Sequence, residues 1–211
     1  MGFKLKSEST KDDDAPLSND KMSDHVYLFE NSLPQNFCSH LIKRFQIDER
    51  KYDGVTGGGL NKEIKDSLDL NIIPFEDWKE EKEFLDECLF YALDQIPVPA
   101  YMTPNFTGNK TPHDQQYSYD CYQIQEYLPK TVGYKWHHDA MINDLGSRVI
   151  TYLWYLNTIN DNSGHTQFGW GELIEPKEGS LLLFPSTPLF VHRGTPTKTH
   201  KKYICTGWLY I

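Results

Sequence analysis

Two stretches near the carboxyl end decide the fold: residues 134–139 read YKWHHD, and residues 192–208 read HRGTPTKTHKKYICTGW. In an extended strand, residues two apart point to the same side, so the His137 imidazole and the Asp139 carboxylate face one way while His138 faces the other. A second imidazole from a distant strand would complete two His and one carboxylate around a metal ion, and His192 is the best candidate. This ligand set leaves coordination positions open and is typical of non-heme Fe(II) oxygenases.

Short motifs surround these stretches in a regular order. Tyr127 comes first, and the later motifs are an Arg-x-x-Thr strand ending in Tyr-Leu-Asn, a turn with Thr-x-Phe, Pro-x-x-Gly before a Leu-rich strand, and a distal His-x-Gly followed by a basic residue. They occupy Arg148 to Asn157, Gly164 to Phe168, Pro176 to Phe184, His192 to Gly194, and Lys202. Together they resemble the 2-oxoglutarate and Fe(II)-dependent dioxygenases, and within them the prolyl 4-hydroxylase-like branch. The resemblance covers roughly residues 118 to 211. It departs at His165, where the family usually has a second Gly.

The resemblance implies an α+β, mainly β fold: a double-stranded β-helix, or jelly roll, with supporting helices from the amino-terminal half. It also implies a reaction that uses Fe(II), O2 and 2-oxoglutarate as co-substrate and releases succinate and CO2. Ascorbate is a candidate further cofactor. The expected metal ligands, and the catalytic residues, are His137, Asp139 and His192.

A 2-oxoglutarate molecule also needs a cation for its second carboxylate, inside a poorly hydrated space. Strand alternation places Lys202, Thr206 and Trp208 on one face and Lys201 on the other, so we expect Lys202 to be the anchor. The resemblance adds Tyr127 and Tyr155 as phenol donors to the co-substrate, and Thr206, on the same strand face as Lys202, is a candidate for a further hydroxyl beside it. Ordinary core roles for these hydroxyl residues remain open. Arg148 and Thr151 look like residues that only build the barrel.

The substrate is harder to predict. A Gly-rich segment contains Gly57, Gly58 and Gly59, and in prolyl 4-hydroxylases a mobile loop from this part of the chain closes over a peptide. An ordinary surface loop is an equal alternative. Trp136 and Arg193 are further candidates for substrate contact, together with the nearby aromatic residues Tyr134, Phe168 and Trp170.

Three regions divide the 211 residues. Residues 1–22 have almost no large apolar side chains, so we expect a flexible tail. Residues 23–211 should form a single dioxygenase domain, with the β-helix core over about 118–211. Apolar spacing predicts one helix that follows Pro34 and another from about Asp77 to Gln95. The period then changes to that of strands, which we expect at 119–127, 134–139, 148–157, 165–174, 180–184, 189–193 and 201–210.

The overall charge and the cysteines indicate which partners and which cellular compartment to expect. A net charge of −9 argues against a nucleic-acid surface, which needs a face rich in Lys and Arg. Four widely spaced cysteines, no signal peptide and no long apolar run predict reduced thiols, a cytoplasmic location and no membrane span. We expect a monomer or weak homodimer.

These observations favour a peptidyl-proline hydroxylase whose partner is a proline-containing peptide or protein, of the procollagen-proline 4-dioxygenase kind. Hydroxylation of a free amino acid or another small molecule is the main alternative. A nucleic-acid demethylase should have an Arg-rich motif after the distal His, and a non-catalytic metal-binding jelly roll would not need both a triad and an anchor for 2-oxoglutarate. Both are weaker alternatives.

Overall fold

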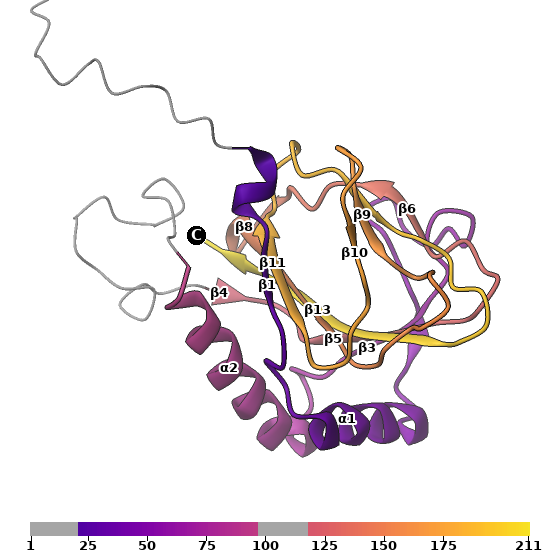
Figure 1. Cartoon of the computed structure of the whole chain (residues 1–211). Coiled ribbons are helices and arrows are strands. Elements are labelled where there is room, and N and C mark those ends of the chain that lie inside the picture. Colours follow the sequence, from indigo (N-terminus) through magenta and orange to yellow (C-terminus); the bar gives the residue numbers. More distant parts are fainter. Residues whose placement is uncertain (1–20, 97–117) are drawn as a thin grey trace, which may run out of the picture.

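The computed structural model describes residues 21–96 and 118–211. Within them, two antiparallel sheets lie against each other, and two helices pack along the outer side of the larger sheet (Figure 1). This arrangement agrees with the predicted jelly roll and its supporting helices. Of the metal-ligand candidates, His137 and His192 lie on the smaller sheet, opposite each other.

The larger sheet has the strand order β1-β11-β8-β13-β5-β3-β2 among the described residues, with β4 paired to β13 and β7 paired to β8. Its central strands are the long β8 and β13, which pair over most of their length. The bounds are β1 (Tyr27–Phe29), β2 (Tyr52–Asp53), β3 (Leu68–Asn71), β4 (Ser118–Tyr119), β5 (Gln123–Tyr127), β7 (Ile142–Asn143), β8 (Gly146–Tyr155), β11 (Leu181–Pro185) and β13 (Lys202–Tyr210).

The smaller sheet has the order β10-β9-β12-β6. Its strands are β6 (Tyr134–His137), β9 (Thr166–Phe168), β10 (Leu173–Ile174) and β12 (His192–Gly194). The helical elements are η1 (Met22–His25), α1 (Gln35–Ile47), η2 (Glu76–Trp78) and α2 (Lys79–Leu93).

Both predicted helices are confirmed. In α1, residues Cys38, Leu41 and Phe45 recur every three or four positions and are buried, as an amphipathic helix requires. The Lys51 ammonium donates to the carbonyls of Phe45 and Gln46 and so satisfies groups left free at the end of this helix. The second predicted helix is α2, preceded by the single turn of η2 rather than beginning at Asp77.

Alternation along the strands divides the apolar residues between two cores. Leu181 and Leu183 point to the helices and join the core beneath α1 and α2. Leu182 and Phe184 point the other way and join the core between the sheets. A strand covered on both faces reads as a continuous apolar run, which explains the Leu-rich motif.

Several predicted strands are shorter or divided. The predicted strand 165–174 is a hairpin of β9 and β10, because Gly171 adopts a left-handed φ of +101° and its N–H donates back to Phe168 in a tight turn. The predicted strand 119–127 is divided into β4 and β5. The short strands β1, β2, β3 and β7 were not predicted, since two to four residues carry too little periodicity to be recognised.

Two further boundaries also shift. The predicted strand 189–193 begins only at His192, because the Phe190 N–H donates to the Thr187 carbonyl and closes a turn. The predicted strand 134–139 ends at His137, so Asp139 lies just beyond it.

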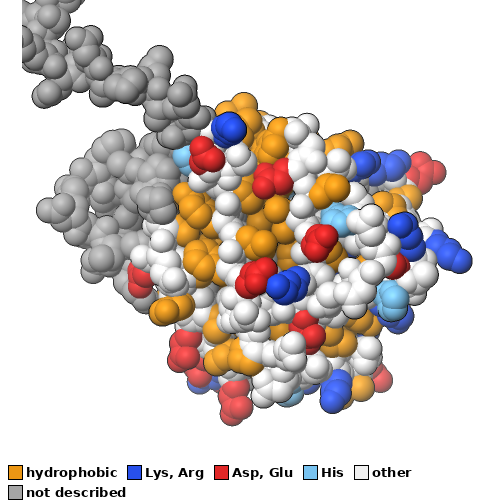
Figure 2. Space-filling view, in the orientation of Figure 1, with side chains coloured by type: hydrophobic (Ala, Val, Ile, Leu, Met, Phe, Trp, Pro, Cys, Tyr) orange, Lys and Arg blue, Asp and Glu red, His pale blue; other side chains and the backbone are white. Residues whose placement is uncertain are grey.

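The expected tail lies almost entirely outside the described residues, so its extent and the single-domain boundary stay predictions. Among residues 21–96 and 118–211, no helix is long and apolar enough to cross a membrane. On the face shown in Figure 2, Lys and Arg side chains are interspersed with Asp and Glu, while apolar side chains gather over the middle.

Candidate active site

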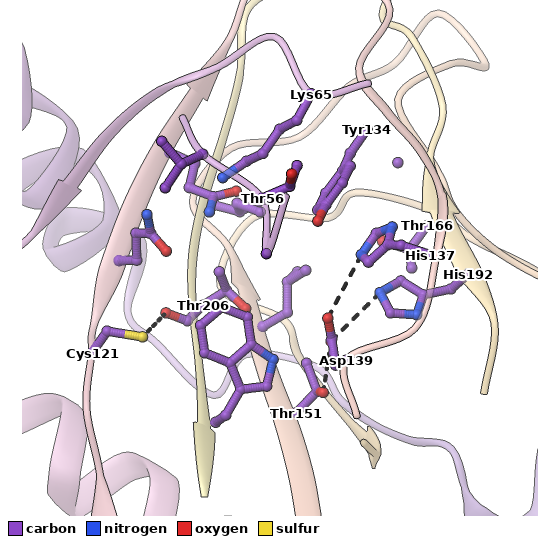
Figure 3. A pocket seen from close by; sticks show the side chains of 18 of the residues that line it. Thr56, Lys65, Cys121, Tyr134, His137, Asp139, Thr151, Thr166, His192 and Thr206 are labelled. Atoms are coloured by element: carbon purple, nitrogen blue, oxygen red, sulfur yellow. Dashed lines mark hydrogen bonds and ion pairs between the residues drawn. The ribbon is translucent and has the colours of Figure 1, made fainter. Parts of the chain in front are cut away.

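The structure brings His137, Asp139 and His192 together. β12 pairs with β6 so that His192 lies directly opposite His137, and Asp139 follows two residues later. The Nε2 atoms of His137 and His192 each lie 3.7 Å from a different carboxylate oxygen of Asp139 (Figure 3). One ligand atom from each residue fits within 4.8 Å of the others, so the three could hold one metal ion.

Neighbouring groups fix the orientation of each of these side chains. The Nδ1 atom of His137 lies 2.7 Å from the Lys135 carbonyl, and that of His192 lies 3.0 Å from the Phe190 carbonyl. A carbonyl only accepts, so Nδ1 carries the proton in both rings and the Nε2 lone pair is left for a metal. The Thr151 hydroxyl donates to Asp139 Oδ2 at 2.8 Å and holds the carboxylate in place.

The protonation states also suit a divalent cation. Burial, and then the electrostatic influence of the neighbouring His192 imidazole, lower the pKa of His137 to about 4. Burial opposes ionisation of Asp139, but the two imidazoles and the Thr151 hydroxyl outweigh it, so the pKa of Asp139 lies below its usual value. At neutral pH the site therefore offers a neutral His137 and an anionic carboxylate, which is the form that binds metal.

An irregularity in β6 adds an aromatic ring to the site. His192 pairs with His137 and Gly194 with Tyr134, so two residues of β6 oppose the single residue Arg193. Such a bulge re-aims side chains, and here it turns Tyr134 to the same side as His137. The two rings stack with centroids 3.6 Å apart and planes 15° apart, which braces the imidazole.

Lys202 has the surroundings expected of an anchor for a carboxylate. The predicted alternation is confirmed, because Lys202, Ile204, Thr206 and Trp208 all line one cavity of about 550 Å³ that also contains the triad. The Lys202 side chain is only 4% exposed and forms no hydrogen bond or ion pair with the described residues. Burial without a counter-charge lowers its pKa to about 7. The unbalanced charge fits the second carboxylate of 2-oxoglutarate.

Lys201 has a different environment. Its ammonium is exposed and forms an ion pair with Glu126 at 3.0 Å on the outer face of the sheet. It is therefore separated from the cavity, as the strand register predicts.

The predicted hydroxyl donors are placed less uniformly. Tyr127 lines the cavity and donates to Gln125 at 2.8 Å. Thr206 also lines it and donates to the Tyr152 carbonyl. Tyr155 is not part of the lining: its hydroxyl donates to Thr166 at 2.7 Å, and it is Thr166 that faces the cavity. Their roles toward a co-substrate stay predictions.

Some of the predicted substrate residues lie at the cavity and others beside it. Gly57 lines it, together with Val55 and Thr56, whereas Gly58 and Gly59 lie in the turn just outside. Trp136 is 46% exposed and is not in the lining; the Arg193 guanidinium lies over its ring at 4.7 Å and donates to Gln167. Neither residue of this pair is among those that line the cavity.

Sequence reasoning missed the contribution of Arg148 and Thr151. Thr151 binds a metal-ligand candidate, and Arg148 lines the cavity with its guanidinium 3.6 Å from the Trp208 ring centroid. In the ladder Thr151 pairs with Trp208. Since paired residues face the same side, the position of Trp208 in the predicted inward face could have identified Thr151.

The turn that departs from the family pattern at His165 keeps its essential glycine. Gly164 has φ of +69°, and a Cβ there would approach Thr197 within 2.8 Å. His165 is buried without a left-handed backbone, and its carbonyl accepts from the Thr195 N–H. The histidine therefore replaces the family's second Gly without disturbing the turn.

Comparisons with known proteins agree with this site. Residues 122–210 match the family model of the 2OG-Fe(II) oxygenase superfamily. Over this part of the chain, the resemblance to that superfamily predicted from the sequence is confirmed. Members of the superfamily use Fe(II), 2-oxoglutarate and O2, and the triad with Lys202 fits these groups. A comparison with curated proteins found no match.

Solved structures with the same fold include three prolyl hydroxylases. One is a prolyl hydroxylase from Trichoplax adhaerens in complex with a peptide fragment of the hypoxia inducible factor oxygen degradation domain (18% identity, 89% of this chain and 84% of that chain, TM-score 0.69). A prolyl-4-hydroxylase from Pseudomonas putida has 18% identity, 88% and 92% coverage and a TM-score of 0.60. The viral collagen prolyl hydroxylase of Paramecium Bursaria Chlorella virus-1, in its 2OG complex, has 19% identity, 89% and 97% coverage and a TM-score of 0.57.

Proposed function

We propose that the protein is a Fe(II)- and 2-oxoglutarate-dependent dioxygenase that hydroxylates a prolyl residue within a peptide. The observation that carries this proposal is one cavity that contains both the His137–Asp139–His192 triad and the buried amine of Lys202, which has no hydrogen-bond or ion-pair partner among the described residues. A structural metal site would have no use for that amine. Burial favours the neutral amine in the empty site, and a bound carboxylate would favour the charged form by pairing with it.

The reaction would convert R–H, O2 and 2-oxoglutarate into R–OH, succinate and CO2. Iron and 2-oxoglutarate supply the activation of O2 and the oxygen transfer, while the protein orients the reactants. His137, Asp139 and His192 would hold the metal, with Thr151 fixing the carboxylate and Tyr134 bracing the His137 ring.

The remaining side chains bind and shield. Lys202 would receive the co-substrate carboxylate in a dry environment, where a charge-assisted hydrogen bond is strong. The apolar neighbours Leu153 and Ile204 line the same cavity and limit the access of water.

The Gly-rich loop lines part of the cavity, and two polar groups in the same lining favour a peptide as substrate. Arg148 presents a guanidinium that can donate to a peptide carbonyl, and the hydroxyl of Tyr134 makes no hydrogen bond with the described residues. The Trichoplax relative of the same fold was solved with a peptide. We also keep as proposals a cytoplasmic location, a monomer or weak homodimer, ascorbate binding, and the absence of nucleic-acid and membrane partners.

A free amino acid is the second candidate substrate. The cavity lining contains Arg148 and Asp120, which carry the opposite charges that would recognise the carboxylate and the ammonium of a zwitterion. A cavity of about 550 Å³ is also within the usual range for a small molecule, roughly 300–1,000 Å³.

A succinate-release assay separates these candidates. The purified protein with Fe(II), 2-oxoglutarate and ascorbate would be incubated with proline-containing peptides, free proline and other amino acids, and methylated oligonucleotides. Succinate stimulated by a proline-containing peptide, and absent with the His192→Ala variant, is the expected result. Stimulation by free amino acids alone would replace the peptide assignment, and no succinate under any condition would contradict dioxygenase function.

A further inference from the structure

The Gly-rich loop, defined here as residues 54–65, connects the two sheets at the mouth of the cavity. It leaves β2 in the larger sheet and ends beside β6 in the smaller one (Figure 1). At its tip, Thr56 and Gly59 exchange two backbone hydrogen bonds of 3.0 and 2.8 Å, so the loop is a tight hairpin rather than an irregular coil. Val55, Thr56 and Gly57 line the cavity.

The beginning of the loop rests on Asp69. The Gly54 N–H donates to the Ser67 carbonyl at 2.8 Å. A Cβ at Gly54 would lie 2.2 Å from the Ser67 hydroxyl and about 3 Å from both carboxylate oxygens of Asp69, so only glycine allows this approach.

The end of the loop meets the same carboxylate. The Lys65 ammonium lies 2.5 Å from Asp69 Oδ2, and the two side chains are 4% and 0% exposed. Ser67 and Gln123 also donate to Asp69, which fixes its position on β3. The loop therefore has a neck, made of Gly54, Lys65 and Asp69.

Lys65 also connects this neck to the metal-ligand candidates. Its backbone pairs with Tyr134, and hydrogen bonds from Lys135 to Ile64 and from Asp66 to Gly133 flank that pair. Tyr134 in turn stacks on His137. Figure 3 shows the Lys65 side chain at the edge of the pocket beside Tyr134.

A buried ion pair is a poor source of stability but a good source of fixed geometry. Desolvation of both charges offsets most of their attraction, and replacing such a pair by neutral residues is often tolerated. Burial raises the pKa of the Asp69 carboxyl even though Lys65 opposes this, which illustrates the cost. What the pair provides is one allowed arrangement of the two ends of the loop.

We propose that Lys65 and Asp69 are positioning residues whose ion pair holds the Gly-rich loop over the cavity and thereby controls productive binding of the peptide. The part that concerns peptide binding rests on the proposed function. The part that concerns the loop does not, because the position of the loop can be measured without any substrate.

The test uses a neutral double variant, Lys65→Met with Asp69→Asn, which removes both charges and leaves no unpaired charge buried. Lys65→Arg keeps the cation as a rescue variant. The matched control is Lys82→Met, which removes a cation from another Lys–Asp pair four residues apart, at 2.8 Å on α2 and outside the cavity. A thermal unfolding transition and circular dichroism establish that each variant is folded.

Two measurements are made on the full chain. Hydrogen exchange of the Gly54 and Asp66 amides, which donate to the Ser67 and Gly133 carbonyls at the two ends of the loop, reports whether the loop is held in place. We expect about tenfold faster exchange in the double variant, equivalent to about 1.4 kcal/mol. Loss of peptide-dependent kcat/KM should exceed the loss of peptide-independent 2-oxoglutarate turnover by about tenfold as well. The Lys65→Arg variant, which keeps the cation, should stay close to the native protein in amide exchange and in peptide-dependent kcat/KM. The Lys82→Met variant should change neither quantity.

Unchanged exchange at Gly54 and Asp66 in the double variant would overturn the neck, and so would equal acceleration throughout the chain or an equal effect of Lys82→Met. Equal losses of peptide-dependent and peptide-independent turnover would overturn its role in peptide binding. If the native protein processes no proline-containing peptide, the proposed function fails, while the exchange data still decide whether the neck exists.

Discussion

The two walls of the cavity are built in different ways. The wall that carries the chemistry consists of strands. His137 and His192 are paired between β6 and β12, and Lys202 and Thr206 lie on the cavity face of β13. The wall toward the mouth is a loop whose two ends meet at the single carboxylate of Asp69. Strand geometry has a period of two and leaves a signature in the sequence, whereas the neck of the loop exists only in three dimensions.

The largest effect should come from the strand-built wall. His137→Ala, Asp139→Ala and His192→Ala should each abolish Fe(II)-dependent turnover while leaving the protein folded, because each removes one of three ligands from an open site. Succinate assays and metal analysis of the purified variants check this. Full activity in any one variant would remove that residue from the metal site.

The anchor for the co-substrate comes next. Lys202→Ala should raise the KM for 2-oxoglutarate about 10- to 150-fold, which corresponds to losing about 1.5–3 kcal/mol from a hydrogen bond to a charged group. Lys201→Ala is the matched control and should change KM little, because that ammonium lies outside the cavity. The reverse ranking would mean that the functional face of β13 differs from the cavity face.

The loop wall should affect substrate rather than chemistry. Trimming Gly57 to Gly59 removes most of the hairpin tip, so peptide-dependent turnover should fall about tenfold or more relative to uncoupled 2-oxoglutarate decarboxylation. Both rates can be measured in one assay with and without peptide. Parallel losses of the two rates would show that the loop supports the metal site and not the substrate.

The pH dependence should give the smallest effect. In the empty site Lys202 has a pKa of about 7, so above that pH binding of an anion requires uptake of a proton. Affinity for 2-oxoglutarate should therefore weaken as pH rises from 7 to 8, by at most about tenfold per pH unit. Calorimetry on protein loaded with a redox-inert divalent metal measures this, and Lys202→Arg should remove the dependence because Arg stays protonated. A flat profile in the native protein would contradict an unpaired Lys202.

The sequence allowed much of the strand-built wall to be predicted. The spacing of His137 to Asp139 and the alternation from Lys202 to Trp208 both follow from strand geometry, and the structure places all of these residues in one cavity. The sequence could not show that Thr166, and not Tyr155, lines the cavity. The two hydroxyls are hydrogen-bonded to each other, and only the folded structure shows which of them faces inward. The stacking of Tyr134 on His137 depends on a bulge, which breaks the alternation that sequence reasoning uses.

The loop wall was harder to predict for a physical reason. The glycines indicated a loop, but the burial of Lys65 and Asp69 is unusual for charged residues and depends on partners from distant strands. The strands next to the neck, β2 and β3, are also too short to show a recognisable pattern in the sequence.

Mass spectrometry of a proline-containing peptide, after reaction with the protein, Fe(II), 2-oxoglutarate and O2, detects the product of the proposed hydroxylation itself. We expect a mass gain of about 16 Da, one oxygen atom, located on proline at C4, because a single oxygen is transferred and the cofactor supplies the chemistry. The gain should be absent with Asp139→Ala. Product on free amino acids or nucleobases, with none on any proline-containing peptide tried, would contradict the prolyl assignment and leave only the dioxygenase.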